Sequence, residues 1–442
     1  MSSTREDLPD RLKPHVIMRE LNEPVRALSG PFWLGEAIVD SDLVFRWTPS
    51  PALVFDGTYS QAALKLDGSS DWVLRSDNPD FEVSVLLTSV INGPAGPRVQ
   101  GVVNRPVSLG ESPLHAIRFC LANFPSYIGA GVRYEREGSR GTMSGRLQVV
   151  SELGECILDP IPEARELGKA ATRDAGWVVT HVGEWRPAGG QMTVLEAQEA
   201  LHMLHLWFGF LRGAWAGPLF PQGLLREEVM WREFGAWDLD ESRSVSTWMP
   251  QRALLDLSDL FAGYVRRWTD AAWKQPLMYS IHWLVEANSP SVGLEPTIVL
   301  SQVALEMLAW VLLVETEELH SRSDFRRLSA AGRMRILLQH IGVPTALPDY
   351  MGRLPSLVQG DAFDGPGVIA RVRNALVHAS EDNRAVTAAL DGPTLFECSQ
   401  LSLQYVDLAI LAACGHTGYY ARRAWRGWKG DDEVPVPWAA TG

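Results

Sequence analysis

Short runs of alternating apolar and polar residues dominate the chain from about residue 36 to residue 185. In the run 115–124, the apolar residues Ile117, Phe119 and Leu121 alternate with smaller or polar neighbours. This period of two predicts a strand with one buried face. Similar runs, separated by turns rich in Gly and Pro, predict eight to ten strands without intervening helices. Such a pattern is typical of an antiparallel β-sandwich or barrel.

After about residue 190 the pattern changes to a helical one, with apolar residues at i, i+3, i+4 and i+7. Residues 217–251 form a poorly periodic connector. The fold class that we expect is therefore segregated α+β: an N-terminal antiparallel β-sandwich or barrel, followed by an all-α helical bundle. The seven predicted helices are 193–215, 252–268, 273–288, 296–315, 325–341, 367–379 and 395–428.

One apolar run, from Ile298 to Val314, is long enough to raise the question of a membrane span. Gln302 and Glu306 lie inside it, and a carboxylate at the centre of a bilayer costs a few kcal/mol. We therefore expect a buried helix of a soluble bundle. The N-terminus has no apolar signal segment, and the four cysteines are far apart with no CxxC pair, so a cytoplasmic location is expected.

Charge limits the kind of partner. The net charge of −13 argues against a protein that coats nucleic acid with its whole surface, but it permits a local basic cleft. The sequence contains no phosphate-binding Gly-rich loop and no nucleophile elbow, so kinase, dinucleotide-binding and α/β-hydrolase functions are excluded.

The segment 364–380, DGPGVIARVRNALVHAS, has the most specific chemical pattern. At about 100° per residue, Arg371, Asn374 and His378 share the polar face of a helix. Arginine matches phosphate geometry and histidine transfers protons near neutral pH. Together they could cleave RNA through attack of the 2′-hydroxyl on the adjacent phosphate, with no metal and no cofactor. The alternative is an ordinary solvated helix face.

Arg373, Asn374 and His378, as RNALVH, match the R-N-x3-H form of the R-x4–6-H motif, and the chain thereby resembles the HEPN superfamily. The segments 204–223, 279–288 and 299–310 look like further landmarks of the ApeA-like branch of that superfamily, which also carries a β-rich N-terminal domain. The resemblance implies a homodimer with one composite ribonuclease site. It also implies tRNA or other cellular RNA as substrate and a role in abortive anti-phage defence.

Two questions about this site stay open. The motif selects Arg373, yet helical periodicity places it about 140° from His378, whereas Arg371 lies on the polar face at the R-x6-H spacing. Either arginine could contact the phosphate. Glu306 could pair with one of them and fix its guanidinium; alternatively, it pairs with another cation or reaches solvent.

Other candidates have plain alternatives. Arg422, Arg423 and Arg426 alternate with aromatic residues, a pattern that suits single-stranded RNA but also the basic last turn of a helix. His202 and His205 have metal-ligand spacing, but ordinary polar positions on an amphipathic helix are the favoured interpretation, and no metal site is expected.

The sequence predicts five domains or segments and leaves more than one function possible. A possible phage-derived trigger would act at the β-rich domain. The leading function is a homodimeric endoribonuclease; the alternative is a non-catalytic HEPN-fold scaffold for dimerisation or RNA binding. A third, weaker possibility is a ligand-binding β-sandwich with an oligomerising bundle. The five domains or segments are an N-terminal arm (1–30), a β-rich sensor or regulatory domain (31–190), the first helix and connector (191–250), a HEPN-like helical domain (251–430) and a flexible tail (431–442).

Overall fold

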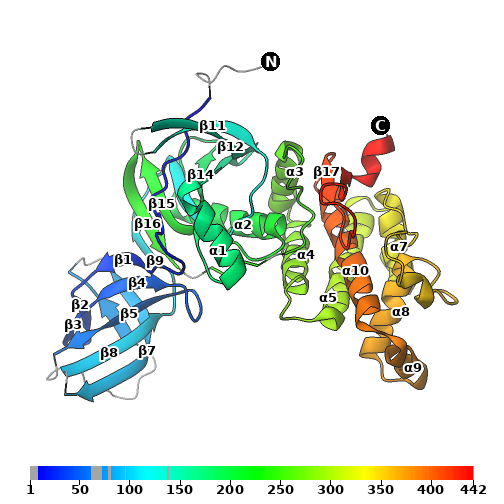
Figure 1. Ribbon diagram of the computed structural model, residues 1–442, viewed down its shortest axis with the longest axis horizontal. Coiled ribbons are helices and arrows are strands. Elements are labelled where there is room, and N and C mark those ends of the chain that lie inside the picture. The colour runs from blue at the N-terminus through cyan, green and yellow to red at the C-terminus, as the bar shows by residue number, and fades with distance from the viewer. Residues whose placement is uncertain are drawn as a thin grey trace.

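The chain forms an arch of three units in a row (Figure 1). One foot of the arch is a β unit, the bend is a second β unit, and the other limb is helical, ending in a hairpin of α8 (Gly365–Val377) and α9 (Glu381–Ala389). The segregated α+β layout predicted from the sequence is confirmed. The computed structural model describes residues 8–60, 72–77, 81–94, 96–136, 139–235, 237–243 and 245–441.

The first β unit is a closed antiparallel barrel. Strand β5 pairs with β3 and β4 along one edge and with β8 along the other, which closes the ring β5–β3–β2–β6–β7–β8. Alternate residues of β5, such as Leu53 and Phe55, point into the barrel core, as its period of two requires. The strands are β1 (Val25–Ser29), β2 (Phe32–Leu34), β3 (Ala37–Asp40), β4 (Asp42–Arg46), β5 (Ala52–Tyr59), β6 (Trp72–Arg75), β7 (Glu82–Gly93) and β8 (Gly96–Val103).

The second β unit is an open antiparallel sheet in the order β11-β12-β13-β14-β10-β15-β16-β9. It carries two α-helices, α1 (Arg165–Asp174) and α2 (Val194–Arg212), and a 3-10 turn, η1 (Pro162–Ala164). The strands are β9 (Val107–Gly110), β10 (Ala116–Ala122), β11 (Ala130–Arg136), β12 (Ser139–Val150), β13 (Gly154–Pro160), β14 (Val179–Pro187), β15 (Leu219–Leu225) and β16 (Glu228–Phe234).

Two sequence expectations about this unit are wrong. The segment 217–251 is not only a connector, because β15 and β16 come from it and complete the sheet. Most of β15 is buried, so its residues show no alternation that periodicity could detect. Helix α1 lies in a region expected to contain only strands. It is short and mostly polar, and only Ala171 is buried.

Both faces of the second sheet are covered. On one face, Phe119 and Trp185 pack with Trp207 of α2 in a core that continues into the helical unit. On the other face, Cys120 and Val182 belong to the core of the barrel. The second sheet therefore joins the other two units through continuous apolar packing.

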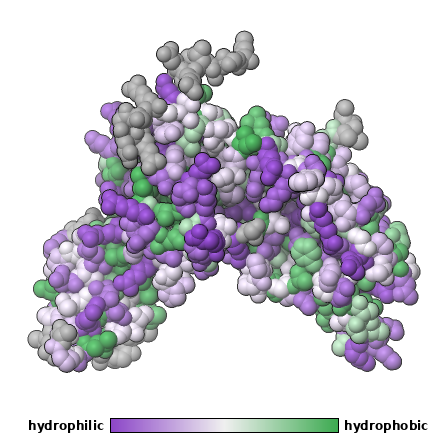
Figure 2. Space-filling view, in the orientation of Figure 1, coloured by the Kyte–Doolittle hydropathy of each residue, from purple (hydrophilic) through white to green (hydrophobic). Residues whose placement is uncertain are grey.

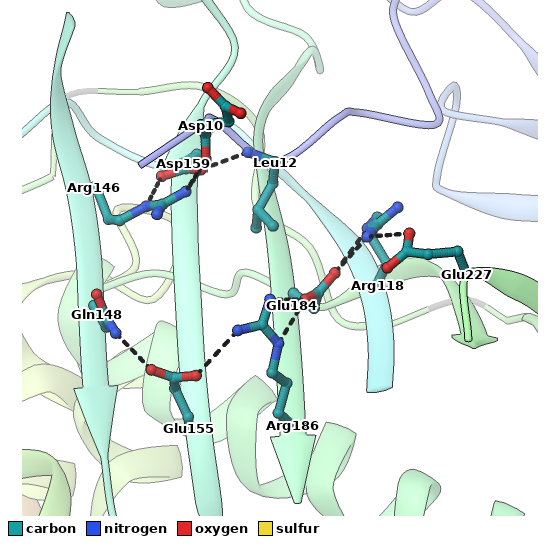
Figure 3. Close-up of polar contacts among 10 residues, drawn as sticks. All are labelled: Asp10, Leu12, Arg118, Arg146, Gln148, Glu155, Asp159, Glu184, Arg186 and Glu227. Carbon is teal, nitrogen blue, oxygen red and sulfur yellow. Dashed lines mark hydrogen bonds and ion pairs between the residues drawn. The ribbon is translucent and has the colours of Figure 1, made fainter. Parts of the chain in front are cut away.

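The N-terminal segment before β1 is bound to the second sheet by an ion pair that is almost fully buried (Figure 3). The Arg146 guanidinium donates two hydrogen bonds to the Asp159 carboxylate, at 2.8 and 2.6 Å. Asp159 also accepts from the Leu12 backbone N–H at 2.8 Å, and Arg146 donates to the Asp10 carbonyl at 2.9 Å. The part of the predicted arm that the structure describes is thus integrated into the fold.

A ladder of charges crosses the same sheet (Figure 3). The buried Glu184 carboxylate accepts hydrogen bonds from Arg118 and from Arg186, and Arg186 also donates to Glu155. Every one of these groups has a partner of opposite charge. The ladder therefore stabilises the pairing of β10, β14 and β13.

The helical unit is built around α5, which packs against α4, α8 and α10. Together α5 and η2, a π-helical turn, are long and apolar enough to span a bilayer, but 67% of their most apolar window is buried in the fold. The buried-helix prediction is therefore confirmed. The elements are α3 (Ser258–Thr269), α4 (Lys274–Ala287), α5 (Leu294–Trp310), η2 (Val311–Thr316), α6 (Arg322–Arg327), α7 (Ala330–His340), η3 (Leu354–Leu357), α8, α9, α10 (Gly392–Ala413), β17 (Tyr419–Ala421), β18 (Glu433–Pro435) and η4 (Pro437–Thr441).

Two predicted helices are shorter than periodicity suggested. The segment 325–341 breaks between α6 and α7, where the Ser329 hydroxyl accepts the Gly332 N–H and caps α7. The segment 395–428 is helical only to Ala413, and the chain then turns at Gly415, whose φ is +73°. Glycine adopts that left-handed conformation without strain, which ends a helix despite an apolar sequence beyond it.

Hydrogen bonds tie the connector to the helical unit. The Glu433 carboxylate accepts from the backbone N–H groups of Gln251, Arg252 and Ala253, at 2.8, 2.9 and 2.6 Å. The Asn288 side-chain amide, after α4, donates to the Ser246 carbonyl at 2.8 Å. The chain between the second sheet and α3 is therefore held near its middle and near its end.

Candidate active site

Helix α8 begins at a buried, fully bonded cap. The Asp364 carboxylate accepts the Gly367 N–H at 2.9 Å, and Arg335 of α7 donates to both of its oxygens at 2.7 and 2.9 Å. Burial alone would raise the pKa of Asp364, but these hydrogen bonds outweigh it and lower the pKa. Pro366, in the first turn, needs no partner for a backbone N–H. The cap fixes where α8 starts and which face turns inward.

The inward face of α8 is apolar and the outward face carries the candidate residues. Ile369 and Val372 are fully buried in the bundle core. Arg371 and Arg373 are half-buried, whereas Asn374 and His378 are exposed. The amphipathic pattern of the segment therefore predicted its orientation correctly.

Arg371 is bonded to its own surroundings. Its guanidinium donates to the Leu357 carbonyl at 2.9 Å and to the Gln359 side chain at 2.6 Å. These contacts hold η3 and the following loop against α8. The hydrogen bonds of the Arg371 guanidinium therefore mainly stabilise the fold.

Arg373 is much less committed. One terminal nitrogen donates to the Asn374 side-chain oxygen at 3.3 Å. Its Nε is buried and has no hydrogen-bond partner among the residues that the structure describes. A buried guanidinium nitrogen without a partner is energetically unfavourable unless a ligand supplies one. The Asn374 side-chain oxygen contacts this guanidinium.

His378 lies where α8 ends. Its backbone has left the helical conformation, with φ −114° and ψ 119°, although its N–H still donates to the Asn374 carbonyl at 2.9 Å. The Asn383 side chain donates to its carbonyl at 2.9 Å. The angle of about 140° from Arg373 assumed an ideal helix through residue 378. The ideal-helix angle therefore does not give the direction of the His378 side chain, because the backbone leaves the helix at this residue.

Sequence analysis missed α9, which follows the candidate site directly. Ser380 caps it by accepting the Asn383 N–H, and Arg384 donates to the Ala379 carbonyl at 2.6 Å. No residue of α9 is buried. The cap residue, followed by Glu381 and Asp382 in the first turn, is a start signal that could have found this helix. Arg384 adds a cation beside His378.

The proposed pairing of Glu306 with Arg371 or Arg373 is wrong. Its carboxylate accepts from Arg333 at 2.7 Å and from Gln302, four residues earlier on α5, at 2.8 Å. The alternative prediction, that Glu306 pairs with another cation, is therefore confirmed, and that cation is Arg333. It connects α5 to α7 and supports α8 only through that packing.

The three C-terminal arginines are not one basic surface. Arg423 is buried and donates to Asp407 at 2.5 Å, so it cannot reach an RNA phosphate. Arg426 pairs with the buried Glu397 at 3.0 Å. Arg422 lies over the Trp425 ring at 4.0 Å and donates to the Asp431 carbonyl. The helical-turn alternative is also wrong, since α10 ends before these residues.

The histidines of α2 belong to its packing. His205 is buried and stacks on Trp215, with 4.9 Å between the ring centroids. Burial lowers its pKa to about 4. Glu199, the third residue at metal-ligand spacing, instead pairs with Lys274 at 2.6 Å.

The fold and site together define a segregated α+β protein whose α8–α9 hairpin carries a half-buried Arg373 beside exposed Asn374 and His378. Two family models match the chain: the YopA central domain over residues 110–245 and the YopA C-terminal domain over residues 270–433. These ranges correspond to the second β unit and to most of the helical unit. The barrel lies outside both ranges.

A full-length relative extends this similarity. The chain is 25% identical over 420 residues to the SPbeta prophage-derived uncharacterized protein YopA of Bacillus subtilis (strain 168). The alignment covers 91% of this chain and 92% of the relative, so it extends into the barrel. No solved structure matches the chain.

Proposed function

We propose that this chain is a metal-independent endoribonuclease of the HEPN type, with Arg373 and His378 in its active site. The observation that carries the proposal is the exposed end of α8. There, a guanidinium with an unpartnered buried nitrogen and a solvent-accessible imidazole belong to one R-N-x3-H motif. Arginine and histidine are the residue types that phosphate binding and proton transfer require.

The packing of the helical unit supports a HEPN-like fold. Three of the four segments that carry the resemblance, 279–288, 299–310 and 373–378, lie in α4, α5 and α8, whereas the fourth, 204–223, spans the end of α2 and the start of β15 in the second β unit. Helix α5 packs against both α4 and α8. These three segments therefore pack together in one helical bundle.

In the proposed reaction, the RNA supplies its own nucleophile. His378 accepts the proton of a 2′-hydroxyl, whose oxygen attacks the adjacent phosphorus. The P–O2′ bond forms, the P–O5′ bond breaks, and the leaving 5′-oxygen takes a proton from His378 of the partner subunit. Arg373 stabilises the charge that develops on the phosphate oxygens. The products are a 2′,3′-cyclic phosphate and a 5′-hydroxyl, and cleavage persists in EDTA because only protein groups act.

The same hairpin supports a homodimer. A helix as short as α9 is marginal in water without packing, and yet none of its residues is buried. Val377, beside His378, is 47% exposed. A second copy of this hairpin would cover both and would bring two candidate sites together. We expect Val377→Asp to convert the dimer into monomer in light scattering, whereas Leu195→Asp, at a 76% exposed position of α2, leaves the mass unchanged.

We further propose a cytoplasmic role in abortive anti-phage defence, with tRNA or another cellular RNA as substrate. The prophage-derived relative is compatible with a phage context. An RNase that attacks its host needs a restraint, and the β units are the proposed place where a phage-derived trigger acts.

The decisive experiment compares wild type with His378→Ala in cells, with and without phage infection. New 5′-hydroxyl RNA ends, detected by sequencing, and slower growth should appear with wild type and not with His378→Ala. His320→Ala, at a half-buried histidine elsewhere in the helical unit, is the matched control and should behave as wild type. Identical RNA ends and identical growth for all three proteins would rule out the endoribonuclease hypothesis and favour the non-catalytic scaffold.

A further inference from the structure

A large cavity opens in the second β unit, far along the chain from the candidate active site. Its volume is about 800 Å³, within the range of about 300–1,000 Å³ typical of small-molecule sites. Its walls are the loops that follow β10 and β13, helix α1 and the connector around residues 242–251. Figure 2 shows hydrophilic residues over the part of this face where α1 lies in Figure 1.

The charge of the cavity wall is one-sided. Arg165, Lys169, Arg212 and Arg243 line it, and no Asp or Glu is among the described residues that do. This is a strong local departure in a chain whose net charge is −13. A cleft lined by one sign of charge concentrates ligands of the opposite sign, so the cavity favours an anion.

Three of these cations are available to a ligand. Arg165 is exposed at the start of α1, and its guanidinium makes no hydrogen bond or ion pair with any residue that the structure describes. Arg243 pairs with Asp240 at 3.1 Å, but its Nε is buried and has no hydrogen-bond partner in the described part of the chain. Lys169, one turn after Arg165, pairs only with the exposed Glu166. These three form a cationic rim.

Arg212 has a different role in the wall. Its guanidinium donates to the backbone carbonyls of Trp215, Asp240 and Glu241. It therefore holds the connector in place beside the cavity. Its hydrogen bonds are already taken, so it supplies charge rather than a direct contact.

The buried part of the cavity is aromatic. Tyr127 and His181 stack with 5.8 Å between ring centroids and an interplanar angle of 14°, and Phe124 packs edge-on against His181 at 5.4 Å. All three are buried. Burial lowers the pKa of His181 to about 3, so its imidazole is neutral at physiological pH. The floor thus offers neutral rings, which pack favourably against another planar ring.

We infer that this cavity binds a nucleotide, with its phosphates at Arg165, Lys169 and Arg243 and its base against the Phe124 and Tyr127 floor. Guanidinium forks match phosphate oxygens in geometry and charge, and an aromatic floor accommodates a base through stacking. The cationic rim and the aromatic floor suit the two halves of one amphipathic ligand. This inference does not depend on the ribonuclease activity.

The test is isothermal titration of the purified full-length protein with ADP, GDP, CDP and UDP. Separate titrations use inorganic pyrophosphate and the four nucleosides. We expect saturable binding of at least one diphosphate at concentrations below about 1 mM, and weaker binding of pyrophosphate and of the corresponding nucleoside. The double substitution Arg165→Gln and Arg243→Gln should raise the dissociation constant about tenfold or more, as loss of charge-assisted hydrogen bonds requires.

Arg173→Gln is the matched control, because Arg173 lies on the same helix and pairs only with its exposed neighbour Asp174. It should bind nucleotide as wild type does. Thermal melts of all variants establish that they are folded. The inference is overturned if none of the four diphosphates binds or if the double variant binds as wild type. It is equally overturned if pyrophosphate alone binds as tightly as any nucleotide, which would remove the base from the site.

Discussion

The two arginines of α8 should separate cleanly into one that stabilises the fold and one that acts on RNA. Arg371 donates to the Leu357 carbonyl and to Gln359. Charge-assisted hydrogen bonds contribute about 1.5–3 kcal/mol when buried, and less for a half-exposed side chain. Arg371→Gln should therefore lower the free energy of unfolding by about 1–2 kcal/mol. It should reduce RNA cleavage less than tenfold, a modest change in transition-state stabilisation.

Arg373→Gln should have the opposite effect: little change in the free energy of unfolding and a large loss of RNA cleavage. In the described part of the chain, the one side-chain hydrogen bond of Arg373 is a 3.3 Å contact with Asn374, and removal of its unpartnered buried Nε relieves a desolvation cost. The change in stability should stay within about 0.5 kcal/mol. Loss of a group that stabilises developing negative charge typically reduces turnover by about 10²–10³, and that is the expected loss of cleavage.

The assay combines urea unfolding with initial rates on labelled total cellular RNA, for wild type and both variants at equal folded concentration. The reasoning is refuted if Arg371→Gln loses as much activity as Arg373→Gln while remaining folded. It is equally refuted if Arg373→Gln is destabilised by more than about 1 kcal/mol. Absence of cleavage by wild type itself would instead contradict the ribonuclease proposal.

Three further predictions concern the frame around the site. Asp407→Asn leaves the buried Arg423 cation unpaired and should cost about 3–5 kcal/mol in urea unfolding; a loss below about 1 kcal/mol would contradict the buried pair. Because the pKa of Asp364 is lowered, its ionised form contributes stability that is present above its ordinary value of 3.8 and is lost as the pH falls below that value. The stability difference between wild type and Asp364→Asn should therefore be constant near neutral pH and shrink in acid. All four cysteines are buried, and burial raises the pKa of Cys120, Cys398 and Cys414 to about 12. The thiols of the native protein should therefore react slowly with a disulfide reagent at pH 8, whereas in urea all four should react. Rapid reaction of the native protein would disprove the burial.

Periodicity predicted the elements whose two faces differ. The apolar positions of α8 identified the face that turns inward. It failed where both faces meet the same environment. Strand β15 is mostly buried and α9 has no buried residue, so neither shows a contrast between apolar and polar positions.

The sequence predicted which residue types form the candidate site but not the hydrogen-bond and ion-pair partners of their side chains. Sequence spacing could not show that Arg371 is bonded to Leu357 and Gln359, because η3 comes close to α8 only in the folded chain. In the same way, Glu306 is separated from Arg333 by 27 residues. The choice of partner for a charged side chain depends on tertiary packing, which local patterns do not encode.

The arch has a consequence for how the proposed ribonuclease activity would be controlled. The barrel and the α8–α9 hairpin form opposite feet (Figure 1), and His378 is exposed. The barrel of the same chain therefore does not shield the imidazole from solvent in this conformation. A signal received by the barrel has two physical routes to His378: strain transmitted through the apolar packing on the two faces of the second sheet, or a steric block by a neighbouring molecule. Dilution separates these routes, since only the second weakens as the protein concentration falls.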